Sequence, residues 1–151
     1  MPAYLGIDPG ASGGLALING AHCMAHGMPA TERDLWERLK AWDAVTMCCI
    51  EKVGGYMPGS KGNIGSAMFK FGQSYGFLRG CLTAAGIPYE EVHPAKWQRS
   101  LGIVPRGREE PKNHFKNRLK QKAQQLFPKL QVTLCTADAL LIAEHCRRVH
   151  G

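Results

Sequence analysis

Two apolar runs joined by a glycine-rich turn open the chain, and a single acid stands where the first run ends. Residues 3–7 are mostly strand formers, Asp8 follows them, and Pro9 and Gly10 end the run before a second apolar run at residues 15–18. This pattern predicts a β-hairpin. Because an unpaired charge is costly to bury, we expect Asp8 to face a metal ion, another cation or solvent at the sheet edge. An ordinary Asp-Pro-Gly turn, capped by its own carboxylate, is the alternative.

Two further acids stand in comparable places. The apolar run at residues 44–50 ends in Glu51, and a continuous run of this length is typical of a central strand covered on both faces. Asp138 falls in the first turn of a helix predicted over residues 136–149, where the helix dipole favours an ionised acid by about 0.3–1 kcal/mol. Three such acids can converge on divalent cations, which prefer oxygen ligands.

The order of the remaining elements is mixed α/β. Strands are predicted over residues 21–28 and 87–92, and the predicted helices cover residues 32–42, 63–85, 95–101, 113–126 and 136–149. The 151 residues, 44% hydrophobic and 21% charged, are expected to form a single domain over residues 1–151.

The composition also predicts the compartment. No apolar run approaches the roughly 20 residues of a membrane span, and residue 1 leads directly into a predicted strand. The six cysteines show no CxxC pair and no zinc spacing. We therefore expect a reduced, cytoplasmic protein without a membrane partner, most of whose thiols are small core residues.

The net charge of +7 is concentrated in one segment. Residues 96–129 hold ten Lys and Arg against two acids, a local net charge of +8. Such a segment suits a polyanion, most commonly nucleic acid, although a solvated helix face with a basic loop is the alternative. The candidate DNA contacts are Lys61, Phe69, Lys70, Lys96, Arg106, Arg108, Lys112, Lys116 and Lys120.

Short motifs follow one another along the chain: GIDPG at residues 6–10, IEKVGGYMPG and SAMFKFGQSYGFLRG between residues 50 and 80, then VHPAKWQRSLG, KQKAQQLFP and ADALLIAE. In this order they resemble the RuvC-type Holliday-junction resolvases, especially the compact phage and organelle-type members of the RNase H-like superfamily. The resemblance implies an α/β, RNase H-like fold with a mixed five-stranded sheet, its first three strands antiparallel, and helices on both faces. It also implies a homodimer that cuts two strands of a four-way DNA junction symmetrically.

The resemblance further assigns roles to residues. Asp8, Glu51 and Asp138 match the metal-binding acids of the family, which implies two Mg²⁺ ions about 3.5–4 Å apart, with Mn²⁺ as a substitute. It also places a lysine near the scissile phosphate. Lys112, Lys116 and Lys120 are the candidates, and we assign Lys116 to the catalytic residues.

One departure from the family concerns a fourth ligand. The family usually carries a further acid, or a histidine, three to five residues before the last acid, whereas residues 132–135 contain neither. Cys135 stands three residues before Asp138, at the position of that ligand, but a thiolate is a poor ligand for Mg²⁺. A plain core or helix-start residue is the alternative for Cys135.

Glycines line one side of the helix predicted over residues 63–85, namely Gly65, Gly72, Gly76 and Gly80. Each costs about 1 kcal/mol relative to alanine, so we expect a close approach, either by the same helix of a second subunit or by the sheet of the same chain. An alternative role for side chains on this face and just before it is a wedge into the junction centre. They are Phe69, with Tyr56, Met57 and Lys61 before it.

The predicted function is a metal-dependent, structure-selective DNA endonuclease that resolves four-way junctions by paired phosphodiester cleavage. Two alternatives stay open. One is a different RNase H-like nuclease, acting on flaps, on RNA–DNA hybrids or as a general DNase, and the other is a non-catalytic module that binds branched DNA.

Overall fold

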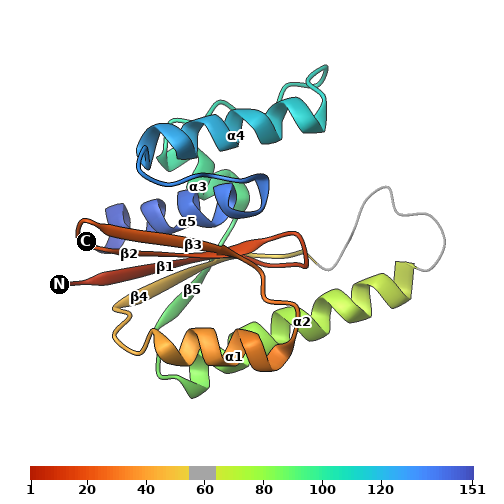
Figure 1. Cartoon of the computed structure of the whole chain (residues 1–151). Coiled ribbons are helices and arrows are strands. Elements are labelled where there is room, and N and C mark those ends of the chain that lie inside the picture. The colour runs from red at the N-terminus through yellow and green to blue at the C-terminus, as the bar shows by residue number, and fades with distance from the viewer. Residues whose placement is uncertain (55–63) are drawn as a thin grey trace.

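Five strands form one mixed sheet in the order β3-β2-β1-β4-β5 (Figure 1). The computed structural model describes residues 1–54 and 64–151. The strands are β1 (Ala3–Asp8), β2 (Gly14–Asn19), β3 (His22–Gly27), β4 (Met47–Glu51) and β5 (Tyr89–Val92). β1 pairs antiparallel with β2 and β2 with β3, whereas β4 runs parallel to β1 and β5 parallel to β4. The predicted sheet, with its three antiparallel leading strands, is confirmed.

Helices cover both faces of this sheet, as predicted. They are α1 (Glu32–Ala41), α2 (Ile64–Ala84), α3 (Pro94–Ser100), α4 (Lys112–Leu126) and α5 (Leu134–His150). Figure 1 shows α3, α4 and α5 on one face and α1 and α2 on the other. Within the described part of the chain, no helix is both long enough and apolar enough to cross a membrane.

Each face of the sheet has its own hydrophobic core. In β1, Tyr4 packs into the core under α5, whereas Leu5 and Ile7 pack into the core formed with α1 and α2. Successive side chains of a strand point to opposite faces, so Asp8 continues the row that faces α5. In β4, Cys49 belongs to the same face, which gives Glu51 the same direction.

Two glycines allow α5 to lie directly on the sheet. A Cβ added at Gly6 would lie 2.3 Å from the carbonyl oxygen of Ala139 and 2.3 Å from the nitrogen of Ala143, and one at Gly14 would lie 2.6 Å from the carbonyl oxygen of Cys135. Real Cβ atoms do not make contacts this short. The backbones of β1, β2 and α5 therefore meet at a distance that only glycine permits.

The start of α5 differs from the prediction. The helix begins at Leu134 because Thr133 is its N-cap, and Thr133 and Thr136 form a reciprocal capping box. Asp138 consequently lies beyond the first turn, and the helix-dipole explanation for its presence is wrong.

The glycine side of α2 has no close neighbour among the described residues. None of them lies within 4 Å of a Cβ added at Gly65, Gly72, Gly76 or Gly80. The alternative of intramolecular packing of these glycines against the sheet is therefore wrong. The buried apolar side chains of α2 lie near its C-terminal end, at Leu78, Cys81 and Leu82. The N-terminal part of α2 extends past the body of the sheet (Figure 1).

Candidate active site

The two strand-end acids lie side by side. β1 and β4 are parallel neighbours in which Ile7 pairs with Ile50, so Asp8 and Glu51 occupy the next positions of the two strands. Neighbouring strands are about 4.7–4.9 Å apart, and both acids face α5. Asp8 thus shares its sheet edge with a second acid, as an ordinary Asp-Pro-Gly turn would not require.

Asp138 approaches the same edge from α5. Burial, followed by repulsion from Asp138 and Glu51, raises the pKa of Asp8 to about 8, and the Lys116 ammonium opposes that shift. Burial also raises the pKa of Asp138 to about 6, again opposed by Lys116. The charge of Asp138 acts on both Asp8 and Glu51, so the three carboxyl groups are brought together, as the sequence predicted, although Asp138 is not held ionised by a helix terminus.

Trp97 is a site residue that the sequence did not identify. Its indole is completely buried, and Nε1 donates a hydrogen bond of 2.9 Å to Oε2 of Glu51. Burial raises the pKa of Glu51 to about 7, while this hydrogen bond lowers it and Asp138 raises it. The only sequence signal was the position of Trp97 within VHPAKWQRSLG, because the contact joins residues 46 apart.

Among the three candidate lysines, Lys116 is the one whose charge acts on both Asp8 and Asp138. Lys112 and Lys120 lie one turn to either side of it on α4. Three partly buried carboxylates that repel one another ionise together only when a cation compensates them. An all-oxygen donor set of this kind fits Mg²⁺ or Mn²⁺.

Cys135 is exposed and is the second residue of α5. Three residues separate it from Asp138, so the two side chains project from the same side of the helix. The interpretation of Cys135 as a core residue is wrong, whereas its position at the helix start is confirmed. The other thiols follow the prediction in four cases, because Cys48, Cys49, Cys81 and Cys146 are buried.

Most of the candidate DNA contacts are solvent-accessible. Phe69 is 67% exposed, and the Arg106 side chain donates to the carbonyl oxygen of Glu110 at 2.8 Å. Part of the basic segment is neutralised internally, since Arg118 makes two bonds of 2.7 and 2.8 Å to the Glu110 carboxylate. Of the other basic candidates, Lys120 is half-buried. The exposed ones are Lys70, Lys96, Arg108, Lys112 and Lys116. Lys61, Tyr56 and Met57 lie outside the described residues.

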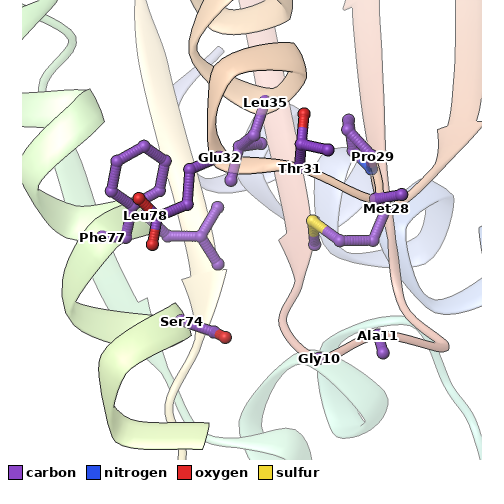
Figure 2. A pocket seen from close by; sticks show the side chains of 11 residues that line it. Gly10, Ala11, Met28, Pro29, Thr31, Glu32, Leu35, Ser74, Phe77 and Leu78 are labelled. Carbon is purple, nitrogen blue, oxygen red and sulfur yellow. The ribbon is translucent and has the colours of Figure 1, made fainter. Parts of the chain in front are cut away.

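A cavity of about 380 Å³ lies next to the β1–β2 turn (Figure 2). Gly10 and Ala11 form one side, and residues at the start of α1 and along α2, including Ser74 and Phe77, form the others. Glu32 is the single ionisable group among the described residues that line it. The cavity lies toward α1 and α2, whereas the acids face α5, so the acid cluster is the candidate active site.

Comparisons with known proteins agree with this fold. No family model and no curated protein matches the sequence. Among solved structures, Thermus thermophilus RuvC in complex with a Holliday junction substrate matches with a TM-score of 0.61 and 15% identity over 99% of this chain and 97% of that chain. A second Thermus thermophilus RuvC structure matches with a TM-score of 0.58 and 17% identity, covering 97% and 96% of the two chains. The chain therefore has the RNase H-like fold of RuvC over nearly its whole length.

Proposed function

We propose that this chain is a metal-dependent endonuclease that cleaves branched DNA and resolves four-way junctions. The observation that carries the proposal is the convergence of Asp8, Glu51 and Asp138 at one sheet edge, with the Lys116 ammonium beside them. The shared fold supports it, because one of the RuvC structures of that fold is a complex with a Holliday junction substrate.

In this proposal the three carboxylates hold the metal and the neighbouring side chains prepare them. When bound, two Mg²⁺ ions would supply an activated water and stabilise the leaving oxygen of the phosphodiester. Trp97 keeps one oxygen of Glu51 fixed by its hydrogen bond and thus positions that carboxylate. Lys116 offsets the negative charge of the acids and of an incoming phosphate.

The basic stripe of α4, formed by Lys112, Lys116 and Lys120, would bind the DNA backbone. If Lys112 and Lys120 contact phosphates, replacing both by alanine should flatten the dependence of log affinity on log salt by about two units, since each contact contributes about 0.9. Arg118→Gln is the matched control, because Glu110 already neutralises that guanidinium. An unchanged slope in the double variant would assign the stripe to solvation.

The open glycine face of α2 is the proposed dimer interface. Small residues permit close backbone approach, and a two-fold interface uses one patch twice, so paired cleavage of two strands follows from symmetry. No described residue lies within 4 Å of a Cβ added at Gly76, and Gly76→Leu should therefore leave the fold intact while shifting sedimentation from dimer to monomer. A variant that stays dimeric would remove this face from the interface.

Cleavage of synthetic substrates tests the whole proposal. A four-way junction, a flap, a duplex and an RNA–DNA hybrid are incubated with Mg²⁺ or Mn²⁺, and we expect paired cuts in the junction. Asp8→Asn, Glu51→Gln and Asp138→Asn should abolish cleavage and keep most junction binding, whereas Glu109→Gln, an exposed acid, should keep both. Preferred cleavage of flaps or hybrids would indicate another RNase H-like nuclease, and binding without cleavage a non-catalytic module.

A further inference from the structure

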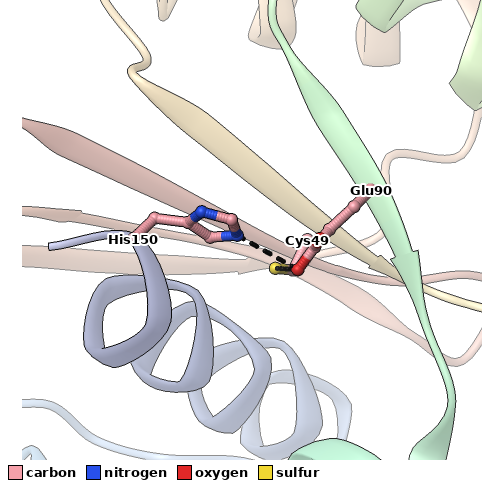
Figure 3. A group of neighbouring side chains, drawn as sticks. All are labelled: Cys49, Glu90 and His150. Carbon is pink, nitrogen blue, oxygen red and sulfur yellow. Dashed lines mark hydrogen bonds and ion pairs between the residues drawn. The ribbon is translucent and has the colours of Figure 1, made fainter.

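Three metal-ligating side chains meet on the α5 face of the sheet, outside the acid cluster. They are Cys49 of β4, Glu90 of β5 and His150 in the last turn of α5 (Figure 3). The Cys49 thiol donates to Oε1 of Glu90 at 3.4 Å, and Nε2 of His150 lies 3.1 Å from the same oxygen. All three ligand atoms lie within 4.8 Å of one another. The proposed cleavage uses none of them.

The backbone itself brings these side chains together. β4 and β5 are parallel neighbours in which Cys49 pairs with Glu90, so the two side chains leave the same face of the sheet side by side. Cys146 and His150 are four residues apart on α5 and lie on one side of the helix. The Cys146 thiol contacts Cys49. The last turns of α5 therefore lie over β4 and β5.

We propose that Cys49, Glu90 and His150 bind one Zn²⁺ ion. Zinc bond lengths of about 2.3 Å to sulfur and about 2.0–2.1 Å to nitrogen and oxygen give tetrahedral separations of about 3.6 Å between S and O and about 3.3 Å between N and O. The corresponding distances here are 3.4 and 3.1 Å, so small side-chain rotations suffice. Mixed sulfur, nitrogen and oxygen donors suit Zn²⁺ and not Mg²⁺.

The partial exposure of Glu90 and His150 gives the ion access to the site. Cys49 is fully buried, whereas the side chains of Glu90 and His150 are 34% and 29% exposed. An ion can enter from the side of Glu90 and His150, and water completes the fourth position there. The bound ion would tie β4 and β5 to the C-terminal turn of α5, the helix that also carries Asp138.

Zinc binding by the purified full chain tests this inference. The metal-free protein is dialysed against Zn²⁺ in the presence of excess Mg²⁺, which occupies all-oxygen sites, and we expect one zinc per chain. Glu90→Gln and His150→Asn alter part-exposed side chains and should keep the fold while weakening zinc binding at least about 10-fold. In Cys49→Ser, the thiolate-to-metal charge-transfer absorption seen with Co²⁺ should disappear.

Three controls separate this site from others. Cys48→Ser changes the neighbouring buried thiol, which belongs to the core on the other face of the sheet, and Cys135→Ser changes the thiol near the acids. Both should keep the zinc, as should Asp8→Asn, so the result does not depend on the proposed cleavage. Zinc at about 100-fold above its dissociation constant should raise the melting temperature by about 5–10 °C.

Two results would overturn the zinc site. One is a full chain that retains no stoichiometric zinc, and the other is equal zinc affinity in Glu90→Gln, His150→Asn and the unmodified protein. Either result would mean that Cys49, Glu90 and His150 form a hydrogen-bonded network only.

Discussion

Replacing Gly6 by alanine tests whether the close approach of α5 to β1 sets the geometry of the acid cluster. The added Cβ would lie 2.3 Å from backbone atoms of both Ala139 and Ala143, whereas ordinary contacts begin at 3.4 Å. No side-chain rotation relieves a clash with helix backbone. The helix or the strand must therefore move by about 1 Å, the gap between these two distances.

The magnitude follows from this displacement. Overpacking of a core costs about 1–3 kcal/mol, and each kcal/mol lowers the melting temperature of a chain of this size by about 2–4 °C. We therefore expect a fall of about 2–12 °C. Asp138 directly precedes Ala139 on the displaced helix, and a misplacement of about 1 Å at a reacting group costs on the order of 100-fold in rate.

Thermal unfolding and single-turnover cleavage of a four-way junction measure the two effects. Gly27→Ala is the matched control, because Gly27 is a strand glycine of the same sheet and none of the residues that the structure describes lies within 4 Å of an added Cβ. It should leave both quantities close to those of the unmodified protein. If Gly6→Ala also melts and cleaves like the unmodified protein, the close approach does not set the site.

Three further predictions concern the acids and their neighbours. The pKa of Asp8 is raised from 3.8 to about 8, so without metal only the unfolded chain ionises this group between about pH 4 and 8. The contribution of this carboxyl to stability is therefore full below about pH 4 and is lost as the pH rises toward about 8. Asp8→Asn should reduce that fall in thermal unfolding with a chelator, and an unchanged pH profile would refute the burial of this charge. Trp97→Phe removes the donor to Glu51 and should raise the pKa of that carboxyl further, so the pH at which cleavage is half-maximal should move upward; an unshifted profile would separate Trp97 from the site. Cys135→Ser should keep most cleavage and Cys135→Asp should lower the Mg²⁺ concentration needed for half-maximal rate, whereas a folded but inactive Cys135→Ser would make the thiol a ligand.

The sequence predicted those parts of the site that follow from local pattern. An apolar run that stops at a carboxylate is visible without the fold, and it identified Asp8 and Glu51. No local signal in the sequence indicates the parallel pairing of Ile7 with Ile50. This pairing is what places the two strand-end acids side by side in one candidate site. The resemblance to the RuvC-type resolvases supplied that step by analogy, and the fold confirms it.

The features that the sequence missed depend on contacts between distant residues. The hydrogen bond of Trp97 to Glu51 joins α3 to β4, and the buried indole would pass as a core residue in any pattern analysis. The helix start was misplaced because the capping box of α5 has a second threonine, Thr136, where glutamate or glutamine is usual. The open face of α2 was also undecided, since glycines at helical spacing serve a sheet contact and a helix contact equally well.

The packing of α5 explains how the fold tolerates three acids that repel one another. Burial raises the pKa of all three acids, and repulsion between carboxylates raises it further for Asp8 and Glu51, so the ionised cluster opposes folding when no cation is present. Ten residues of α5 are buried. The free energy gained from their contacts with the sheet far exceeds what the three carboxylates would recover by moving apart into solvent. The helix therefore cannot retreat to relieve the repulsion, and a bound cation or a proton is the remaining means of relief. If these acids hold divalent metal as proposed, the metal competes with protons for them, and the same residues that destabilise the free protein supply the ligands.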